Sequence, residues 1–370
     1  MRSVFLTNLS IYVTSITLII ISLAIVVQYK YMITYDTGYT KNCILTTRFS
    51  ANMIKQQEGI THKLKQVPDI IDVAYSSNSL IADNPMWGLQ YNGKMIVPYF
   101  LFVSDNFPTL MNINILEGRN FTMEDGTGAG KYIFNETAMK EFSIKVGDPI
   151  QNHNRNMTAQ VIGIAKDFNF KPLYYPIEPF ALYVSGESMW ELSYAYIKVN
   201  NNNLAAIINH IRTTLLEYDN SVASTLKLEF LDQSIGNLYQ KEKNLSFMIS
   251  AFGILAVIIS IIGTIGMIYF ETRYRCKEIG IRKVFGATIL DILWMFNKKY
   301  IAIILISFII ATPIAYFVIE QWQSNFTYKA PFSLWIYLIA LCLLLVITTI
   351  DVTAQSMIAA HQNPAKSIVK

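Results

Sequence analysis

The sequence is poor in charged residues and in cysteine. Asp, Glu, Lys and Arg make up 15% of the 370 residues, whereas a soluble domain has about 25%. Hydrophobic residues make up 52%, which excludes a disordered chain and a cytosolic globular enzyme. Three cysteines are too few for the disulfide framework of a small secreted domain. The apolar residues fall in long runs, so the chain is predicted to be a membrane protein.

Patterns for metal binding or nucleotide hydrolysis are missing as well. The stretch 126–131 is rich in glycine, but Asp125 and Tyr132 stand where a phosphate loop needs Gly and Ser or Thr. A hairpin turn is expected there, and a structural turn at 166–168, so we expect no cofactor, no catalytic residue and no ATP hydrolysis by this chain. The histidines lack metal-ligand spacing with Cys, Asp or Glu and are predicted to be surface residues. They are His62, His153, His210 and His361.

Four apolar runs are each close to or above the ~20 residues that a helix needs to cross a bilayer. They span 11–27, 245–270, 300–319 and 332–350, and none has a charged residue in its interior. Lipid offers no partner for a free backbone amide, so each run is predicted to be a transmembrane helix, kinked in the third run by Pro313. A cleaved signal peptide is the alternative for the first run, but this run is long and lacks a small-residue cleavage site.

The charge of the connecting loops predicts the orientation of the helices. The loop 271–299 holds seven Lys or Arg and three Asp or Glu, whereas the loop 320–331 holds one of each kind. The basic loop is therefore predicted to be cytoplasmic, which places both termini in the cytoplasm and residues 28–244 on the outer side. This outer block has 19 basic and 21 acidic residues, which excludes a nucleic-acid-binding surface.

The outer block is predicted to be an α+β domain with a mostly β insert at about 90–185. A β-α-β pattern lies on each side of the insert. The polar segment 232–244 keeps Ile235 and Leu238 at helical spacing, so a stalk helix continuous with the second span is expected. The predicted elements are strand 42–49, helix 51–66, strand 70–75, strand 191–199, helix 204–218 and strand 225–231.

Four segments carry a resemblance to a known family. The segment 277–288, KEIGIRKVFGAT, resembles the cytoplasmic signature of the FtsX-like and MacB-like permeases of ABC transporters. Residues 118–121 with 135–137, and residues 161–168, are similar to the periplasmic core domain of that family. Residues 363–367 are similar to its C-terminal tail. The resemblance covers nearly the whole chain and is closest to the permeases common in the Bacteroidetes lineage, here as a single half-size unit without an ATPase domain.

The resemblance implies a fold and a location for each part of the chain. The fold class is a multi-pass α-helical membrane protein with four transmembrane helices and a large periplasmic α+β domain between the first two. The implied location is the bacterial inner membrane. The expected parts are the N-terminus and first span (1–27), the periplasmic core domain (28–244), and an FtsX-like permease domain with a cytoplasmic tail (245–370).

The segment 277–288 is predicted to form a short amphipathic helix that Gly286 ends. Ile279, Ile281, Val284 and Phe285 are expected to cluster on one side of it. On the residues alone, such a helix either lies along the membrane surface or docks into a groove of a partner. The resemblance implies docking of a separate cytoplasmic ABC ATPase. The residues expected to form this coupling helix are Lys277, Glu278, Ile279, Gly280, Ile281, Arg282, Lys283, Phe285 and Gly286.

Small residues recur along the second span and are predicted to let another helix approach closely, with a dimer interface as one candidate. The alternative is that glycine is simply common in membrane helices. The predicted packing residues are Gly253, Ser260, Gly263 and Gly266.

The resemblance implies a permease subunit that transmits ATPase-driven motion to its periplasmic domain. The work would be the export or extraction of a lipid, lipoprotein, peptide or antibiotic. The implied partners are the ATPase, a second permease unit in a homo- or heterodimer, the membrane and a periplasmic protein, with no nucleic acid. The alternatives are a regulator of a periplasmic cell-wall hydrolase, and a membrane-anchored sensor, although the cytoplasmic segments are too small for a signalling domain.

Overall fold

The computed structural model describes residues 2–152, 158–184, 191–200, 203–331 and 333–360. The chain divides into two compact units. One unit, here called the membrane unit, consists of Met1–Met32 and Gln240–Lys370. The other, here called the α+β unit, consists of Ile33–Tyr239.

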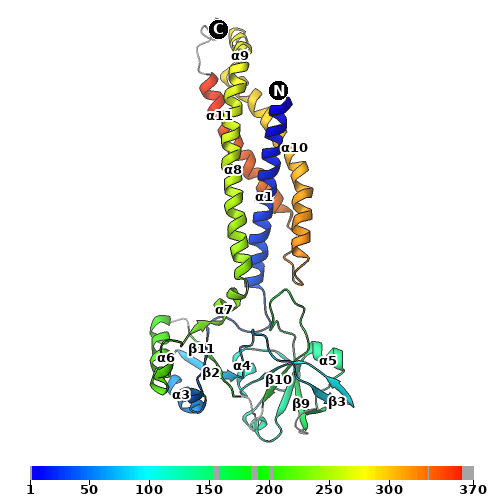
Figure 1. Cartoon of the computed structure of the whole chain (residues 1–370), viewed down its shortest axis with the longest axis vertical. Coiled ribbons are helices and arrows are strands. Elements are labelled where there is room, and N and C mark those ends of the chain that lie inside the picture. Colours follow the sequence, from blue (N-terminus) through cyan, green and yellow to red (C-terminus); the bar gives the residue numbers. More distant parts are fainter. Residues whose placement is uncertain (1, 153–157, 185–190, 201–202, 332, 361–370) are drawn as a thin grey trace. The chain divides into compact units, whose positions relative to one another are not determined.

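The membrane unit is built from four long helices and one short one (Figure 1). The four long helices have the length and the apolar character needed to cross a membrane. Each of them extends past its predicted apolar run into polar flanking residues. Helix α10 continues through Pro313 without a break. The helices are α1 (Arg2–Thr34), α8 (Gln240–Tyr274), α9 (Cys276–Val284), α10 (Ile289–Gln323) and α11 (Leu334–Ala360).

The extended helices include charged residues that flank the apolar runs. Asp351 follows the fourth run directly and lies in α11, and Glu271 follows the second run directly and lies in α8. The candidate spans therefore contain charged residues at their ends, whereas the apolar runs themselves contain none.

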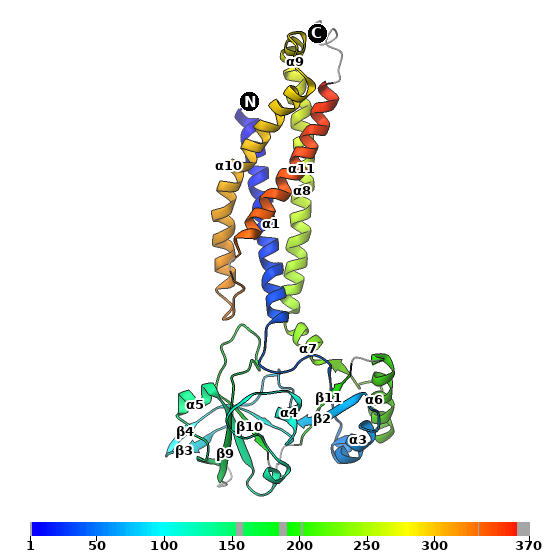
Figure 2. The ribbon, with the colours of Figure 1, turned by 180° about the vertical axis from the view of Figure 1, so that it is seen from behind.

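Helices α1 and α8 lie side by side in both views of the bundle (Figures 1 and 2). Polar side chains link the two helices at several levels. The hydroxyls of Tyr12 and Thr264 lie 2.7 Å apart, and those of Ser22 and Ser250 lie 2.8 Å apart. Because lipid cannot satisfy these hydroxyls, their pairing favours this helix contact over exposure of either face.

A four-stranded antiparallel sheet forms one layer of the α+β unit, in the order β12-β1-β11-β2. Helices α3 and α6 cover one face, where Ile60, Ile211 and Ile197 share a buried cluster. Helices α2 and α3 join β1 to β2, and α6 joins β11 to β12. Each joined pair has one other strand between its members, so the layer is a split β-α-β arrangement. The elements are β1 (Ile44–Arg48), α2 (Ala51–Ile54), α3 (Gln57–Leu64), β2 (Ile70–Ser76), β11 (Tyr194–Val199), α6 (Leu204–Tyr218) and β12 (Glu229–Phe230).

Two elements of this layer differ from the prediction. The helix expected over 51–66 is divided into α2 and α3. The strand expected over 225–231 is only the two-residue β12, because the amides of Thr225 and Leu226 both donate to the carbonyl of Val222 in a turn.

The second sheet has eight strands in the order β4-β3-β8-β9-β7-β10-β5, with β6 paired to β9. Its core is rich in aromatic rings, among them Phe100, Tyr132 and Phe134. The elements are β3 (Leu89–Tyr91), β4 (Lys94–Ile96), β5 (Tyr99–Phe102), α4 (Phe107–Leu110), β6 (Ile115–Gly118), β7 (Lys131–Asn135), α5 (Glu136–Phe142), β8 (Pro149–Asn152), β9 (Thr158–Ala165) and β10 (Phe180–Val184).

The stalk predicted over 232–244 is helical but not continuous with the second span. Helix α7 (Leu231–Leu238) ends at Tyr239, whose φ of −103° and ψ of 22° leave the helical region, and α8 begins at Gln240. Tyr239 is buried at 2% exposure, and its hydroxyl accepts a hydrogen bond of 3.0 Å from the amide of Leu173. This bond holds the tyrosine inside the α+β unit, which explains the interruption.

Candidate functional site

The connection between the second and third long helices is almost entirely helical. It was predicted as a loop over 271–299 with one short helix inside it. In the structure α8 continues to Tyr274, α9 follows at Cys276–Val284, and α10 begins at Ile289. The end of α8, the helix α9 and the start of α10, separated by two short turns, therefore replace most of the expected loop.

Helix α9 ends at Val284, and Gly286 terminates it from two residues beyond, in the role predicted for this glycine. The glycine has φ = +90°, in the left-handed region that favours glycine. The amide of Ala287 donates to the carbonyl of Arg282 at 2.9 Å, which is the six-to-one hydrogen bond of a Schellman motif. Two residues later, Thr288 and Asp291 form a capping box at the start of α10. The reversal between α9 and α10 is thus encoded locally.

The apolar residues of α9 lie on two faces, which corrects the prediction of one cluster. Ile279 is 7% exposed and belongs to the same buried cluster as Ile292 and Phe296. Ile281, Val284 and Phe285 are 53%, 70% and 85% exposed. At 100° per residue, these three positions lie opposite Ile279, so a single face was never possible for a helix.

The first turns of α10 add two apolar side chains that are more than half exposed and that the sequence analysis missed. Leu290 is 75% exposed and Trp294 is 63% exposed. Their spacing of four residues was a detectable helical signal, but the segment was assigned to a loop. The α9–α10 apolar residues are defined as Ile281, Val284, Phe285, Leu290 and Trp294.

The remaining residues of the predicted coupling helix differ in their contacts and exposure. Glu278 and Arg282 form an ion pair of 2.7 Å along α9, and Arg282 also donates to the sulfur of Met295 at 3.0 Å. Gly280 is buried and Lys277 is exposed. The side chain of Lys283 lies outside the described residues. The helix therefore has one face fixed to the bundle and one face presented to the surroundings.

The small residues of α8 meet different neighbours. Gly253 and Ser260 are buried against the bundle, and a Cβ on Gly253 would lie 3.9 Å from the carbonyl oxygen of Leu18 on α1. A Cβ on Gly263 would lie 3.4 Å from Ile11, also on α1. Gly266 is exposed and has nothing within 4 Å. Gly253 and Gly263 thus face α1 of the same chain, Ser260 lies seven residues from Gly253 and so on the same side of α8, and Gly266 is exposed.

The stalk residues are placed unequally. Ile235 is buried at 5% exposure, whereas Leu238 is 37% exposed. Ile235 therefore fixes α7 to the α+β unit, and Leu238 contributes less.

Two of the family-like motifs of the α+β unit cross each other at a pair of glycines. Gly118 of β6 pairs with Gly163 of β9. A Cβ on Gly118 would lie 2.1 Å from the carbonyl oxygen of Ile162, and one on Gly163 would lie 2.6 Å from that of Arg119. The backbones approach too closely for any side chain, so these glycines serve the fold.

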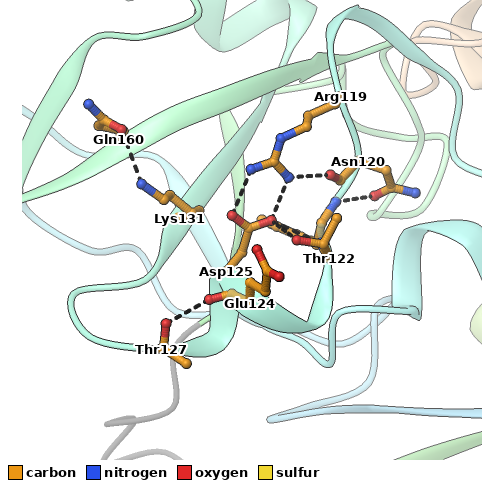
Figure 3. A network of polar contacts seen from close by, with 9 residues as sticks. Arg119, Asn120, Thr122, Glu124, Asp125, Thr127, Lys131 and Gln160 are labelled. Atoms are coloured by element: carbon orange, nitrogen blue, oxygen red, sulfur yellow. Dashed lines mark hydrogen bonds and ion pairs between the residues drawn. The ribbon is translucent and has the colours of Figure 1, made fainter.

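Arg119, which follows this crossing, holds the next turn (Figure 3). Its guanidinium donates to both carboxylate oxygens of Asp125, at 2.5 and 2.8 Å. Asp125 also accepts from the amide and the hydroxyl of Thr122. The guanidinium and these donors lower the pKa of the Asp125 carboxyl to about 2. The glycine-rich stretch that follows leads into β7, where Lys131 donates to Gln160 at 3.1 Å.

Residues 135–137 and the end of the segment 161–168 meet at the start of α5. The side chain of Asn135 caps the helix by accepting from the amide of Ala138, and Asp167 accepts from the amide and hydroxyl of Thr137 at 2.9 and 2.8 Å. Asp167 is therefore a helix-capping residue, in agreement with the structural turn predicted at 166–168.

No group of three or more His, Cys, Asp or Glu side chains that would hold a metal ion occurs among the described residues. His153, His361 and the tail motif at 363–367 lie outside those residues.

Comparison with known families decides the identity of both units. Residues 250–364 match the family described as FtsX-like permease C-terminal. Residues 5–214 match the MacB-like periplasmic core domain. The chain belongs to the MacB- and FtsX-like permeases of ABC transporters. It is a multi-pass membrane protein whose α+β unit is a MacB-like periplasmic core domain inserted between the first and second long helices.

Similar solved structures include a region of MacB and a domain of an ABC-type transporter. The periplasmic region of MacB from Actinobacillus actinomycetemcomitans is 12% identical, with a TM-score of 0.38, and the match covers 56% of this chain and 97% of that chain. The extracellular domain of the noncanonic ABC-type transporter YknZ from Gram-positive bacteria is 11% identical, with a TM-score of 0.37 and coverage of 50% and 98%. No curated protein sequence matches the chain. The assignment rests on the two family models.

Proposed function

We propose that this permease is bound by a separate cytoplasmic ABC ATPase at the α9–α10 apolar residues, in the inner membrane of a bacterium. The observation that carries the proposal is the two-faced helix α9. Ile279 and Gly280 are buried in the bundle, while Phe285 on the other side is 85% exposed. A helix that is fixed on one face and apolar on the other suits docking into a groove of a partner.

The composition of the exposed residues supports a protein partner. Phe285 and Trp294 are large aromatic side chains, which often dominate the binding energy of protein interfaces. Single exposed apolar residues need no explanation, but here the five α9–α10 apolar residues, with Ile289 as a sixth at 38% exposure, lie within fourteen positions, from 281 to 294. Insertion of the same residues into the membrane surface is the competing outcome.

Helix α8 supports the transmission of force. It begins directly after Tyr239 and ends two residues before α9. Its 35 residues correspond to about 52 Å of helix, enough to cross the bilayer as one rod. We propose that closure of the ATPase moves α9 and that α8 carries the movement to the periplasmic core domain. That domain would then act in the export or extraction of a lipid, lipoprotein, peptide or antibiotic, with a second permease unit completing the transporter.

Docking can be tested by charging the apolar residues. Ile281→Asp combined with Phe285→Asp would place carboxylates in an apolar groove, at a cost of a few kcal/mol if they remain unpaired. Co-purification of an ABC ATPase expressed in the same cells, identified by mass spectrometry, should then be lost, while membrane insertion persists. The control is Met123→Asp, at a side chain that is also 85% exposed but lies in the α+β unit. Unchanged co-purification with the double variant would remove the docking claim.

Transmission can be tested by inserting Gly-Ser-Gly-Ser after Gln240. Such a segment behaves as a flexible coil and does not pass force. The insertion variant should therefore still bind the ATPase but show the same phenotype as a strain in which the gene is deleted. The control is the same insertion after Gly93, a hairpin turn where nothing lies within 4 Å of the added Cβ. Full biological output with the insertion after Gln240 would show that the periplasmic domain is not driven through α8.

A further inference from the structure

Glu271 lies in the last turn of α8, and its side chain is 13% exposed. Its carboxylate accepts from the Nζ of Lys299 on α10 at 2.6 Å. The same oxygen lies 3.3 Å from the Nε of Arg275. One largely buried carboxylate therefore joins α8 to α10 and binds the residue that connects α8 to α9.

Further ion pairs extend from Glu271 along α9. Arg275 lies 3.6 Å from a carboxylate oxygen of Glu278, and Glu278 lies 2.7 Å from Arg282. We call Glu271, Arg275, Glu278, Arg282 and Lys299 the charge clasp. It connects the ends of three helices where they meet.

The members of the clasp differ in how strongly water screens them. Arg282 and Glu278 are 50% and 41% exposed, and such exposed pairs contribute little. Glu271 is mostly withdrawn from water, so its two interactions are screened less. Loss of either partner would leave the carboxylate poorly compensated. Glu271 is therefore the member on which the clasp depends.

We propose that Glu271 is a positioning residue that makes α8, α9 and α10 move together, with Lys299 on α10 as its essential partner. This inference rests on the proposed docking of the ATPase to α9. The buried contact of Ile279 holds α9 against the bundle, but an apolar contact is non-directional. The carboxylate, hydrogen-bonded to Lys299 on α10 and paired with Arg275 next to the start of α9, supplies a directional link among the three helices. Without it, α9 would slip relative to α8 when the ATPase closes.

The first test uses the full chain in lipid nanodiscs without any ATPase. In Glu271→Gln and Lys299→Gln, hydrogen exchange of the α9 amides should rise roughly tenfold, because local opening becomes more frequent when the clasp is broken. Lys299→Arg keeps the pair and should exchange as the unmodified chain does. The matched control is Lys298→Gln, since Lys298 is exposed and bonds to none of the described side chains. Equal exchange in Lys298→Gln and Lys299→Gln would overturn the clasp.

The second test adds the ABC ATPase expressed in the same cells. Glu271→Gln and Lys299→Gln should still co-purify with it, but the effect of the permease on its rate of ATP hydrolysis should fall about fivefold or more. Lys299→Arg should retain that effect. Co-purification with unchanged regulation would overturn the positioning role while leaving docking intact. Failure of the unmodified chain to bind the ATPase would instead overturn the proposed function, and the exchange experiment would still decide the clasp.

Discussion

The motif residues of the two units differ in how far they are exposed. In the periplasmic core domain, Gly118, Gly163 and Asp167 are all engaged with other motif residues or with backbone. In the membrane unit the signature is divided, with Ile279 buried and Phe285 exposed. The difference teaches that the first motifs maintain the fold, whereas part of the second is available to a partner. Exposure, rather than family resemblance, separates these two roles.

The largest expected effect comes from filling the glycine crossing. Gly118→Ala would place a Cβ 2.1 Å from a backbone oxygen, at φ = +77°. Overpacking and the left-handed backbone together should cost about 3 kcal/mol or more. Thermal unfolding of the purified chain, with proteolysis of the core domain as the readout, would measure this loss of stability. The control is Gly93→Ala at φ = +73° with nothing within 4 Å, which carries only the backbone cost of about 1–2 kcal/mol. Equal losses would show that the crossing adds nothing.

The next effect concerns acid stability. The pKa of Asp125 is lowered to about 2, against about 3.9 in an unfolded chain. A lowered folded-state pKa contributes stability that is full above pH ~4 and is lost as the pH falls to ~2, about 2 kcal/mol in all. Asp125→Asn should abolish this part of the acid sensitivity of the core domain. Glu124→Gln, at an exposed neighbour, is the control, and identical acid profiles of the two variants would contradict the role of the Arg119 pair.

A somewhat smaller effect is expected for the small residues of α8. Ser260 is 3% exposed, and Ser260→Leu would force α1 and α8 apart at a cost of about 1–3 kcal/mol. Gly266→Leu adds its side chain on the exposed side and should leave the thermal stability of the monomer in detergent unchanged. A weakened dimer in Gly266→Leu alone would identify that side as the interface with the second permease unit. Destabilisation of the monomer by both variants alike would contradict the packing described for α8.

The smallest effect is expected at the interruption between α7 and α8. Tyr239→Phe removes the hydroxyl that accepts from the Leu173 amide and should destabilise the core domain by about 1 kcal/mol. Thermal unfolding measures the loss, with Tyr175→Phe at a 54% exposed ring as the control. A larger loss from the control would show that the Tyr239 bond does not hold the stalk.

The sequence predicted the parts of the fold whose signals are local. The helix expected over 204–218 is α6 with the same limits. Both signals for it are local, namely the apolar spacing within the helix and the turn residues just before it in the sequence. The interruption at Tyr239 was not predictable, since it depends on a hydrogen bond to Leu173, which is distant in the chain. The two faces of α9 were predictable from helical geometry alone, but the prediction placed Ile279 on the same side as Ile281, Val284 and Phe285. The clasp at Glu271 was not predictable from the sequence, because it depends on the position of Lys299 on another helix.

The pairing of α1 with α8 has a consequence for biosynthesis. Tyr12 and Thr264 are 252 residues apart in the chain. At a synthesis rate of 5–20 residues per second, the first helix waits roughly 10–50 s for its partner. During that time its hydroxyl groups have no helix to bond to, and the folding periplasmic domain separates the two spans. We therefore expect the contact between α1 and α8 to form only after the periplasmic domain has been synthesised, because residues 33–239 lie between the two helices in the chain.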